Sequence, residues 1–159
     1  MNKARRAAAR RGRSLRIMFA DEARFGRINR PRPCWAPIGT RPEVAAQLIH
    51  LYGAVSPKDE RCMYLIMPTS NTACFQAFLD ALARKFARQD ILLVLDGAPN
   101  HRCGGLIVPD NITLLYLPPY SPELNPKENI WDEIREKILK NYALKSIAAV
   151  YAKLEQAIL

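Results

Sequence analysis

Residues 91–101 read Ile91-Leu92-Leu93-Val94-Leu95-Asp96-Gly97-Ala98-Pro99-Asn100-His101. Five consecutive apolar residues that end at a turn predict a strand covered on both faces, which is typical of α/β proteins. An ionised carboxylate next to a core is costly unless a cation or hydrogen bonds compensate it. Asp96 is therefore a candidate cation ligand. A cap on the following turn is the alternative, since aspartate often has that role.

Two further acids lie at the ends of predicted elements. The β-prone run 15–20 predicts a strand that ends in Asp21, and a helix predicted to start at Pro126 carries Glu128 in its first turn. Asp21 has two alternatives: it pairs with a nearby arginine, or its neighbour Glu22 takes the ligand role. Alternation along a strand lets only one of the two acids face the site.

The role of Glu128 is open on spacing alone. Asn125 as N-cap, Pro126 at the first helical position and Glu128 at the third form a good capping arrangement, which needs no metal. The helical wheel also places Glu128 beside the apolar stripe of the helix, from which it could reach a site near the core. The residues of this stripe are Ile130, Trp131, Ile134 and Ile138. Glu123 is a rival third acid, but it lies in the proline-rich turn before the helix.

Length and composition indicate one domain with an ordinary core. A chain of 159 residues is too short for two typical domains. No apolar run is long enough to cross a bilayer, and the basic start is unlike a secretion signal. The four cysteines show no paired short spacing, which argues against a zinc site. We expect free thiols in a reducing cytoplasm.

Positive charge is concentrated at the start of the chain. The first sixteen residues carry seven basic side chains and no acid, out of a formal net charge of +9. These basic residues are Lys3, Arg5, Arg6, Arg10, Arg11, Arg13 and Arg16. Such a segment favours a polyanion and salt-dependent binding. A solubilising tail is the alternative.

A second basic stretch follows the first predicted strand. It contains Arg24, Arg27, Arg30, Arg32 and Trp35. Arginines interleaved with an exposed aromatic side chain suit contacts with phosphates and bases. A loop that packs Trp35 on its own domain explains the same residues equally well.

The order of elements predicts a mixed sheet. The predicted strands are 15–20, 47–55, 61–67, 91–95 and 112–117, and helices are predicted from Ser70 or Asn71 to Phe86, from Pro126 and from Ser146. Three strands that start as a meander, followed by helical crossovers, give a five-stranded mixed α/β sheet with helices on both faces.

Three blocks of this sequence carry a family resemblance. They are Phe19-Ala20-Asp21-Glu22-Ala23-Arg24-Phe25-Gly26, Leu95-Asp96-Gly97-Ala98-Pro99-Asn100-His101, and Leu117-Pro118-Pro119-Tyr120-Ser121-Pro122-Glu123-Leu124-Asn125-Pro126-Lys127-Glu128-Asn129-Ile130-Trp131. Together they resemble the signature blocks of the insertion-sequence branch of the Tc/mariner transposase superfamily. The likeness covers nearly the whole chain after the basic arm, and the third block is its most specific part.

The resemblance implies an RNase H-like fold with a catalytic triad of Asp21, Asp96 and Glu128. It implies two Mg²⁺ or Mn²⁺ ions on these carboxylates, and DNA cleavage and strand transfer that join transposon ends to target DNA. His101 lies where the family often has a histidine, and it is a possible substrate contact. Gly97 departs from the asparagine found in many relatives. A homodimer is also implied, with the loop 24–42 reaching towards the partner subunit or the DNA.

The expected organisation is a basic N-terminal arm over residues 1–14 and a DDE catalytic domain over residues 15–159. We expect the chain to lack the helix-turn-helix module that recognises transposon ends in full-length family members. Three interpretations stay open: an active metal-dependent transposase domain, a non-catalytic DNA-binding or dimerising remnant, and another RNase H-like nuclease.

Overall fold

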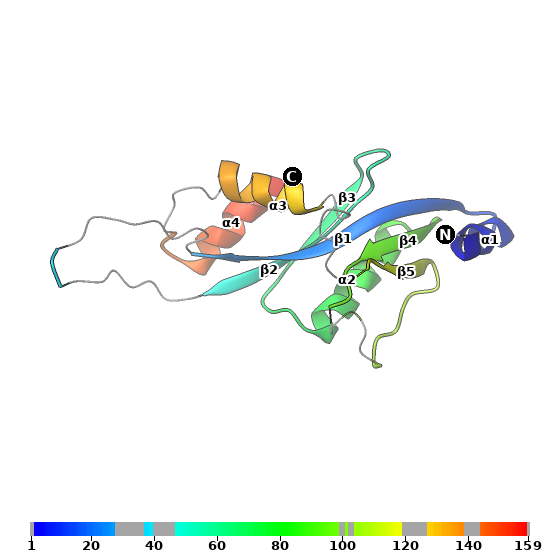
Figure 1. Cartoon of the computed structure of the whole chain (residues 1–159), viewed down its shortest axis with the longest axis horizontal. Helices are drawn as coiled ribbons and strands as arrows, with labels where there is room; N and C mark the ends of the chain where they lie inside the picture. Colours follow the sequence, from blue (N-terminus) through cyan, green and yellow to red (C-terminus); the bar gives the residue numbers. More distant parts are fainter. Residues whose placement is uncertain are drawn as a thin grey trace.

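The computed structural model describes residues 2–27, 37–39, 47–98, 101, 104–118, 127–138 and 144–158. Within these ranges, nothing is described of the side chains of residues 2–3, 127–129 and 137–138. The described residues form one five-stranded sheet in the order β3-β2-β1-β4-β5 (Figure 1). Its strands are β1 (Ser14–Gly26), β2 (Leu48–Val55), β3 (Cys62–Met67), β4 (Gln89–Leu95) and β5 (Ile112–Tyr116).

The sheet is mixed, as the element order predicts. β1 pairs antiparallel with β2, and β2 pairs antiparallel with β3, which gives the expected meander. β4 pairs parallel with both β1 and β5, so the later strands enter the sheet through crossovers. The predicted five-stranded mixed α/β sheet is confirmed.

Helices cover both faces of the sheet. They are α1 (Asn2–Arg10), α2 (Thr72–Lys85), α3 (Lys127–Glu133), the π-helical turn η3 (Ile134–Ile138) and α4 (Ile147–Ile158). α2 packs on one face and α3 with α4 on the other, so the described residues form two hydrophobic clusters with the sheet between them (Figure 1). None of the helices that the structure describes has the length and apolar character needed to span a membrane.

The start of α2 follows from its sequence. Asn71 is the N-cap, and its side chain accepts a hydrogen bond from the backbone N–H of Cys74 at 2.8 Å. The buried positions of the helix are Phe75, Phe78, Leu79 and Leu82. Their spacing of three and four residues puts them on the one face that meets the sheet.

The strand β1 is longer than the prediction, which ended it at Asp21. β1 continues to Gly26 because β2 goes on pairing with it, from Asp21 opposite Gly53 to Gly26 opposite Leu48. Its parallel partner β4 is different, since the last pair there is Phe19 with Val94. Asp21 therefore lies in mid-strand relative to β2, just past the point where the pairing with β4 ends.

Two smaller sequence expectations also have an outcome. Cys62 and Cys74 are free thiols, as expected. Cys34 and Cys103 lie outside the described residues. The start of the chain, expected as an arm, includes the helix α1, in which Ala4 and Ala8 are buried.

Candidate active site

The register between β1 and β4 brings the two predicted aspartates to the same level of the sheet. Phe19 and Val94 form the last pair of these parallel strands. Asp21 follows Phe19 by two residues, and Asp96 follows Val94 by two residues. Adjacent strands lie about 4.8 Å apart, so Asp21 within β1 and Asp96 just after β4 lie at the same level of neighbouring strands, at the carboxyl end of β4.

The side chain of Asp21 is directed towards the face of the sheet that α3 covers. Its Oδ2 accepts a hydrogen bond of 2.8 Å from the indole Nε1 of Trp131 in α3, and its Oδ1 accepts one of 2.8 Å from the backbone N–H of Glu22. Trp131 is 1% exposed and packs edge to face against Phe25 and Tyr64. The aromatic packing fixes the indole, and the indole in turn orients the carboxylate.

Asp96 is exposed and is oriented by His101. The Asp96 side chain keeps 57% of its surface exposed, and its Oδ1 lies 2.8 Å from Nδ1 of His101. The same oxygen accepts the backbone N–H of Ala98 at 3.2 Å, the local turn interaction that the capping interpretation expects. Capping and a ligand role are compatible, because a carboxylate has two oxygens with about four acceptor positions.

His101 is itself firmly placed. The residue is 5% exposed, and its ring centroid lies 4.2 Å from that of Phe75 in α2. The hydroxyl of Tyr116 in β5 donates to the backbone carbonyl of His101 at 2.6 Å. Contacts from α2 and β5 thus hold the imidazole against Asp96.

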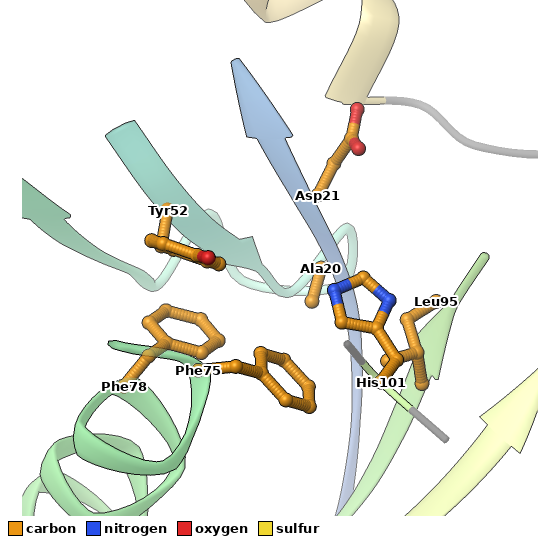
Figure 2. A pocket seen from close by; sticks show the side chains of 7 residues that line it. All are labelled: Ala20, Asp21, Tyr52, Phe75, Phe78, Leu95 and His101. Carbon is orange, nitrogen blue, oxygen red and sulfur yellow. The ribbon is translucent and has the colours of Figure 1, made fainter. Parts of the chain in front are cut away.

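A pocket lies beside these residues, and Figure 2 shows its lining. The lining residues are Ala20, Asp21, Tyr52, Phe75, Phe78, Leu95 and His101. In Figure 2 the carboxyl of Asp21 points away from the rings of Tyr52, Phe75 and Phe78, towards the end of a helix. The lining of the pocket is thus largely aromatic, and His101 adds an imidazole to it, whereas the Asp21 carboxyl is turned towards α3.

Glu22 faces the opposite side of the sheet from Asp21. Its Oε1 lies 2.6 Å from Nδ1 of His50, and its Oε2 accepts a hydrogen bond from the hydroxyl of Ser70, which lies 3.1 Å from the hydroxyl of Tyr52. Burial raises the pKa of Glu22, but the hydrogen bonds from Ser70 and His50 outweigh it and hold the pKa below its usual value. Glu22 therefore belongs to a separate polar network.

Glu128 is described only through its backbone, which lies in the first turn of α3. It stands three residues before Trp131, the residue that donates to Asp21. Positions three apart lie on the same side of a helix. The described residues contain no group of three or more histidine, cysteine, aspartate or glutamate side chains placed to hold a metal ion, and the Glu128 side chain is not among those residues.

The basic residues proposed to contact substrate are only partly described. Arg24 is exposed on β1. Arg27 follows β1, where its Nε donates to the carbonyl of Leu144 at 2.9 Å, while the N–H of Leu144 donates to the carbonyl of Arg27 at 2.8 Å. That exchange ties the end of β1 to the segment before α4. Arg30, Arg32 and Trp35 lie outside the described residues, as do the capping residues Asn125 and Pro126 and the rival acid Glu123.

The sequence interpretation missed one hydrogen bond in this site. It assigned Trp131 to the apolar stripe of its helix, and the residue is indeed buried. A buried tryptophan also needs an acceptor for its indole N–H. That requirement was a readable signal, because three candidate carboxylates were already assigned to one site.

Solved structures similar to this chain give its fold class. The Mos1 mariner paired end complex with Mn matches with a TM-score of 0.67 and 20% identity, over 98% of this chain and 52% of that one. The Mos1 strand transfer complex matches with a TM-score of 0.64 and 21% identity, over 98% of this chain and 51% of that one. This chain therefore spans about half the length of these structures. It is an RNase H-like domain, as the resemblance implied.

Sequence comparison gives the family. A family model described as DDE superfamily endonuclease matches residues 16–150. This chain belongs to the DDE superfamily endonucleases, which confirms the recognition made from the three blocks. A relative from Sinorhizobium fredii (strain NBRC 101917 / NGR234), the uncharacterized protein y4pE/y4sA, is 40% identical over 97 residues, which are 60% of this chain and 72% of the relative.

Proposed function

We propose that this chain is the catalytic domain of a transposase, which cleaves DNA and transfers the cut strand with the help of divalent metal ions. The observation that carries this proposal is the parallel register of β1 and β4, which brings Asp21 of β1 level with Asp96 at the carboxyl end of β4. Glu128 is the proposed third ligand. The domain is proposed to cover residues 15–159.

The donor set fits hard divalent cations. Carboxylate oxygens are the ligands that Mg²⁺ and Mn²⁺ prefer, and Mg²⁺ usually takes one or two carboxylates and keeps several waters. Two such ions, when bound, activate an attacking water or 3′-hydroxyl and stabilise the leaving oxygen of a phosphodiester. The exposure of Asp96 leaves this side of the site open to a phosphate backbone.

Support for Glu128 as third ligand comes from the anchoring of α3. The Trp131 indole ties this helix to Asp21. Glu128 stands one turn before Trp131 in the same helix, which supports it as the proposed third ligand. Capping of α3 by the same residue stays the alternative, and the substitution tests below separate the two roles.

His101 is proposed as a positioning residue in place of a direct phosphate contact. Its Nδ1 is engaged with Asp96, and its ring is buried against Phe75. A partner of this kind fixes the rotamer of a ligating carboxylate and thereby raises metal affinity.

DNA is the proposed substrate and partner. The matched Mos1 structures are described as a paired end complex and a strand transfer complex, and the net charge of this chain is +9. A positive field of this size favours a polyanion. A homodimer, and end recognition by a domain outside residues 15–159, are part of the same proposal.

The test is cleavage of supercoiled plasmid DNA by the full chain with Mn²⁺ or Mg²⁺, and with a chelator. We expect metal-dependent nicking, abolished by Asp21→Asn, Asp96→Asn and Glu128→Gln. Glu133→Gln is the matched control, because Glu133 is an exposed acid in the same helix. Equal loss in both glutamate variants would indicate damage to α3 and would remove the evidence for Glu128.

Two outcomes would favour the other interpretations. DNA binding without nicking under any metal condition supports a non-catalytic remnant. Faster cleavage of RNA–DNA hybrids than of duplex DNA supports a different RNase H-like nuclease.

A further inference from the structure

The helix α1 has an apolar face and a strongly basic face. Ala4 and Ala8, four residues apart, are 4% and 2% exposed, and α1 contacts β1 and β4. Arg5, Arg6 and Arg10 are all exposed. Small alanines let the helix lie close to the sheet, and the arginines point to solvent.

The C-terminal end of α1 has a fixed backbone conformation where it joins the sheet. Gly12 adopts φ +63°, the N–H of Arg13 bonds the carbonyl of Ala8 at 3.0 Å, and the N–H of Gly12 bonds the carbonyl of Ala9 at 3.1 Å. This pattern is a Schellman motif, which ends a helix in one fixed conformation. The chain then enters β1 directly at Ser14.

A buried carboxylate, that of Asp90, anchors the C-terminal end of α1. Asp90 in β4 is 5% exposed, with Nη1 of Arg11 at 3.2 Å and Nη1 of Arg13 at 3.7 Å from its two oxygens. Nη1 of Arg11 also donates to the carbonyl of Asp110. A buried acid without such partners would be strongly destabilising, so these interactions keep the end of α1 in place.

A groove opens beside the C-terminal end of α1, between the end of α2 and the turn before β5. Its lining residues are Arg13, Ala83, Arg84, Ala87, Asp110 and Asn111. Arg84 extends the positive charge of α1 towards α2, while Arg13 lies beside the buried carboxylate of Asp90.

The arginines of α1 repel one another in the isolated domain. Arg6 and Arg10 are four residues apart on the helix, where like charges are neighbours and destabilise it. Residues 1–16 contain no acid that relieves this repulsion. A phosphate backbone lying along the exposed face would relieve it.

We infer that the exposed face of α1 and the adjoining groove form a second binding surface for the phosphate backbone of duplex DNA, remote from the carboxylates. α1 leads into the start of β1 and contacts β4, whereas Asp96 follows the carboxyl end of β4 (Figure 1). Seven residues of β1 separate Ser14 from Asp21, or about 23 Å at 3.3 Å per residue. That span corresponds to about seven base pairs at 3.4 Å each. The inference rests on the proposed function for its choice of DNA.

The test is the salt dependence of duplex binding by the full chain. In the variant Arg5→Gln/Arg6→Gln/Arg10→Gln we expect the slope of log K against log salt to fall by about three, near one for each phosphate that an arginine no longer neutralises. The control Lys58→Gln/Arg61→Gln/Lys145→Gln removes three exposed charges elsewhere. It is expected to change the slope by less than about one.

Equal slopes in the two triple variants would overturn the inference, because the effect would then come from net charge alone. Tighter binding of duplex RNA than of DNA, abolished in the α1 variant, would overturn the choice of DNA. Nicking at saturating DNA separates this inference from the proposed function. Failure of the wild-type chain to nick would contradict the catalytic proposal and leave the binding result standing.

Discussion

At the scale of single residues, the two aspartates have different kinds of support. Asp21 receives a hydrogen bond from a tryptophan that is itself fixed by two aromatic neighbours. Asp96 is exposed and takes its orientation from His101 and the turn that follows it. A rigid acid beside an adjustable one suits a site that must first bind a cation and then admit a phosphate backbone.

The two histidines of the chain provide a matched pair for testing this arrangement. His101→Gln removes the partner of Asp96, and we expect the affinity for Mn²⁺ to fall about 10- to 100-fold, the usual effect of losing a residue that orients a ligand. Titration calorimetry of the full chain with Mn²⁺ measures it. His50→Gln is the control, because His50 contacts Glu22 rather than either aspartate. A similar loss in both variants would contradict a positioning role specific to His101.

Asp59 predicts a pH dependence of stability away from the site. Hydrogen bonds of 2.6 Å from Nη1 of Arg16 to both of its oxygens lower the pKa of Asp59 to about 2. A carboxyl group whose pKa is lower in the folded state stabilises that state above its unfolded pKa of about 3.9. This contribution is lost as the pH falls from about 4 through 2.

Urea unfolding at a series of acidic pH values measures this contribution. We expect the free energy of unfolding to decline less steeply with acidification in Asp59→Asn than in the wild type. Arg16→Gln should likewise make the free energy of unfolding decline less steeply between about pH 4 and pH 2. If both variants lose stability with acidification as steeply as the wild type, this ion pair does not contribute to the pH dependence of stability.

At the scale of elements, hydrophobic pattern located the strands and most helices, but not their ends. β2, β3, β5 and α2 begin within about two residues of their predicted starts, because turns and the Asn71 cap mark them. β1 extends beyond its predicted end because antiparallel pairing with β2 continues past Asp21. Such tertiary pairing leaves no local signal in the sequence.

The helix α1 shows a second limit. Its many arginines suggested an arm, yet the segment also carries four alanines, which are the strongest helix formers. An isolated helix of this length is marginal in water, so its stability depends on burying Ala4 and Ala8 against the sheet. Composition alone reveals the charge but not the docking surface.

Gly12 provides a test of that docking. Gly12→Ala forces a residue with a Cβ into positive φ, and we expect a loss of about 1–2 kcal/mol in the free energy of unfolding and weaker hydrogen-exchange protection in α1. Gly104→Ala is the control, since an added Cβ there meets nothing within 4 Å and the backbone has no positive φ in the strained range. Equal stability of the two variants would contradict a Schellman cap that holds α1.

At the scale of the whole molecule, the sequence blocks located the fold and the family, and the sheet explains why they belong together. Blocks that are about 75 and 32 positions apart meet because β1 and β4 are parallel neighbours and α3 packs on β1. The sequence shows that Trp131 needs an acceptor, but not that Asp21, 110 positions away, supplies it, nor that His101 contacts Asp96. The ligand role of Glu128 stays a prediction.

The central claim is that Asp21, Asp96 and Glu128 converge on divalent metal ions. The most direct test is the anomalous X-ray signal of crystals of the full chain soaked in Mn²⁺, with Asp96→Asn crystals as the control. We predict one or two manganese peaks among the three carboxyl groups of the wild type, weakened or absent in the variant. Carboxyl groups that lie far apart with no manganese between them, or a peak that Asp96→Asn leaves unchanged, would contradict the account.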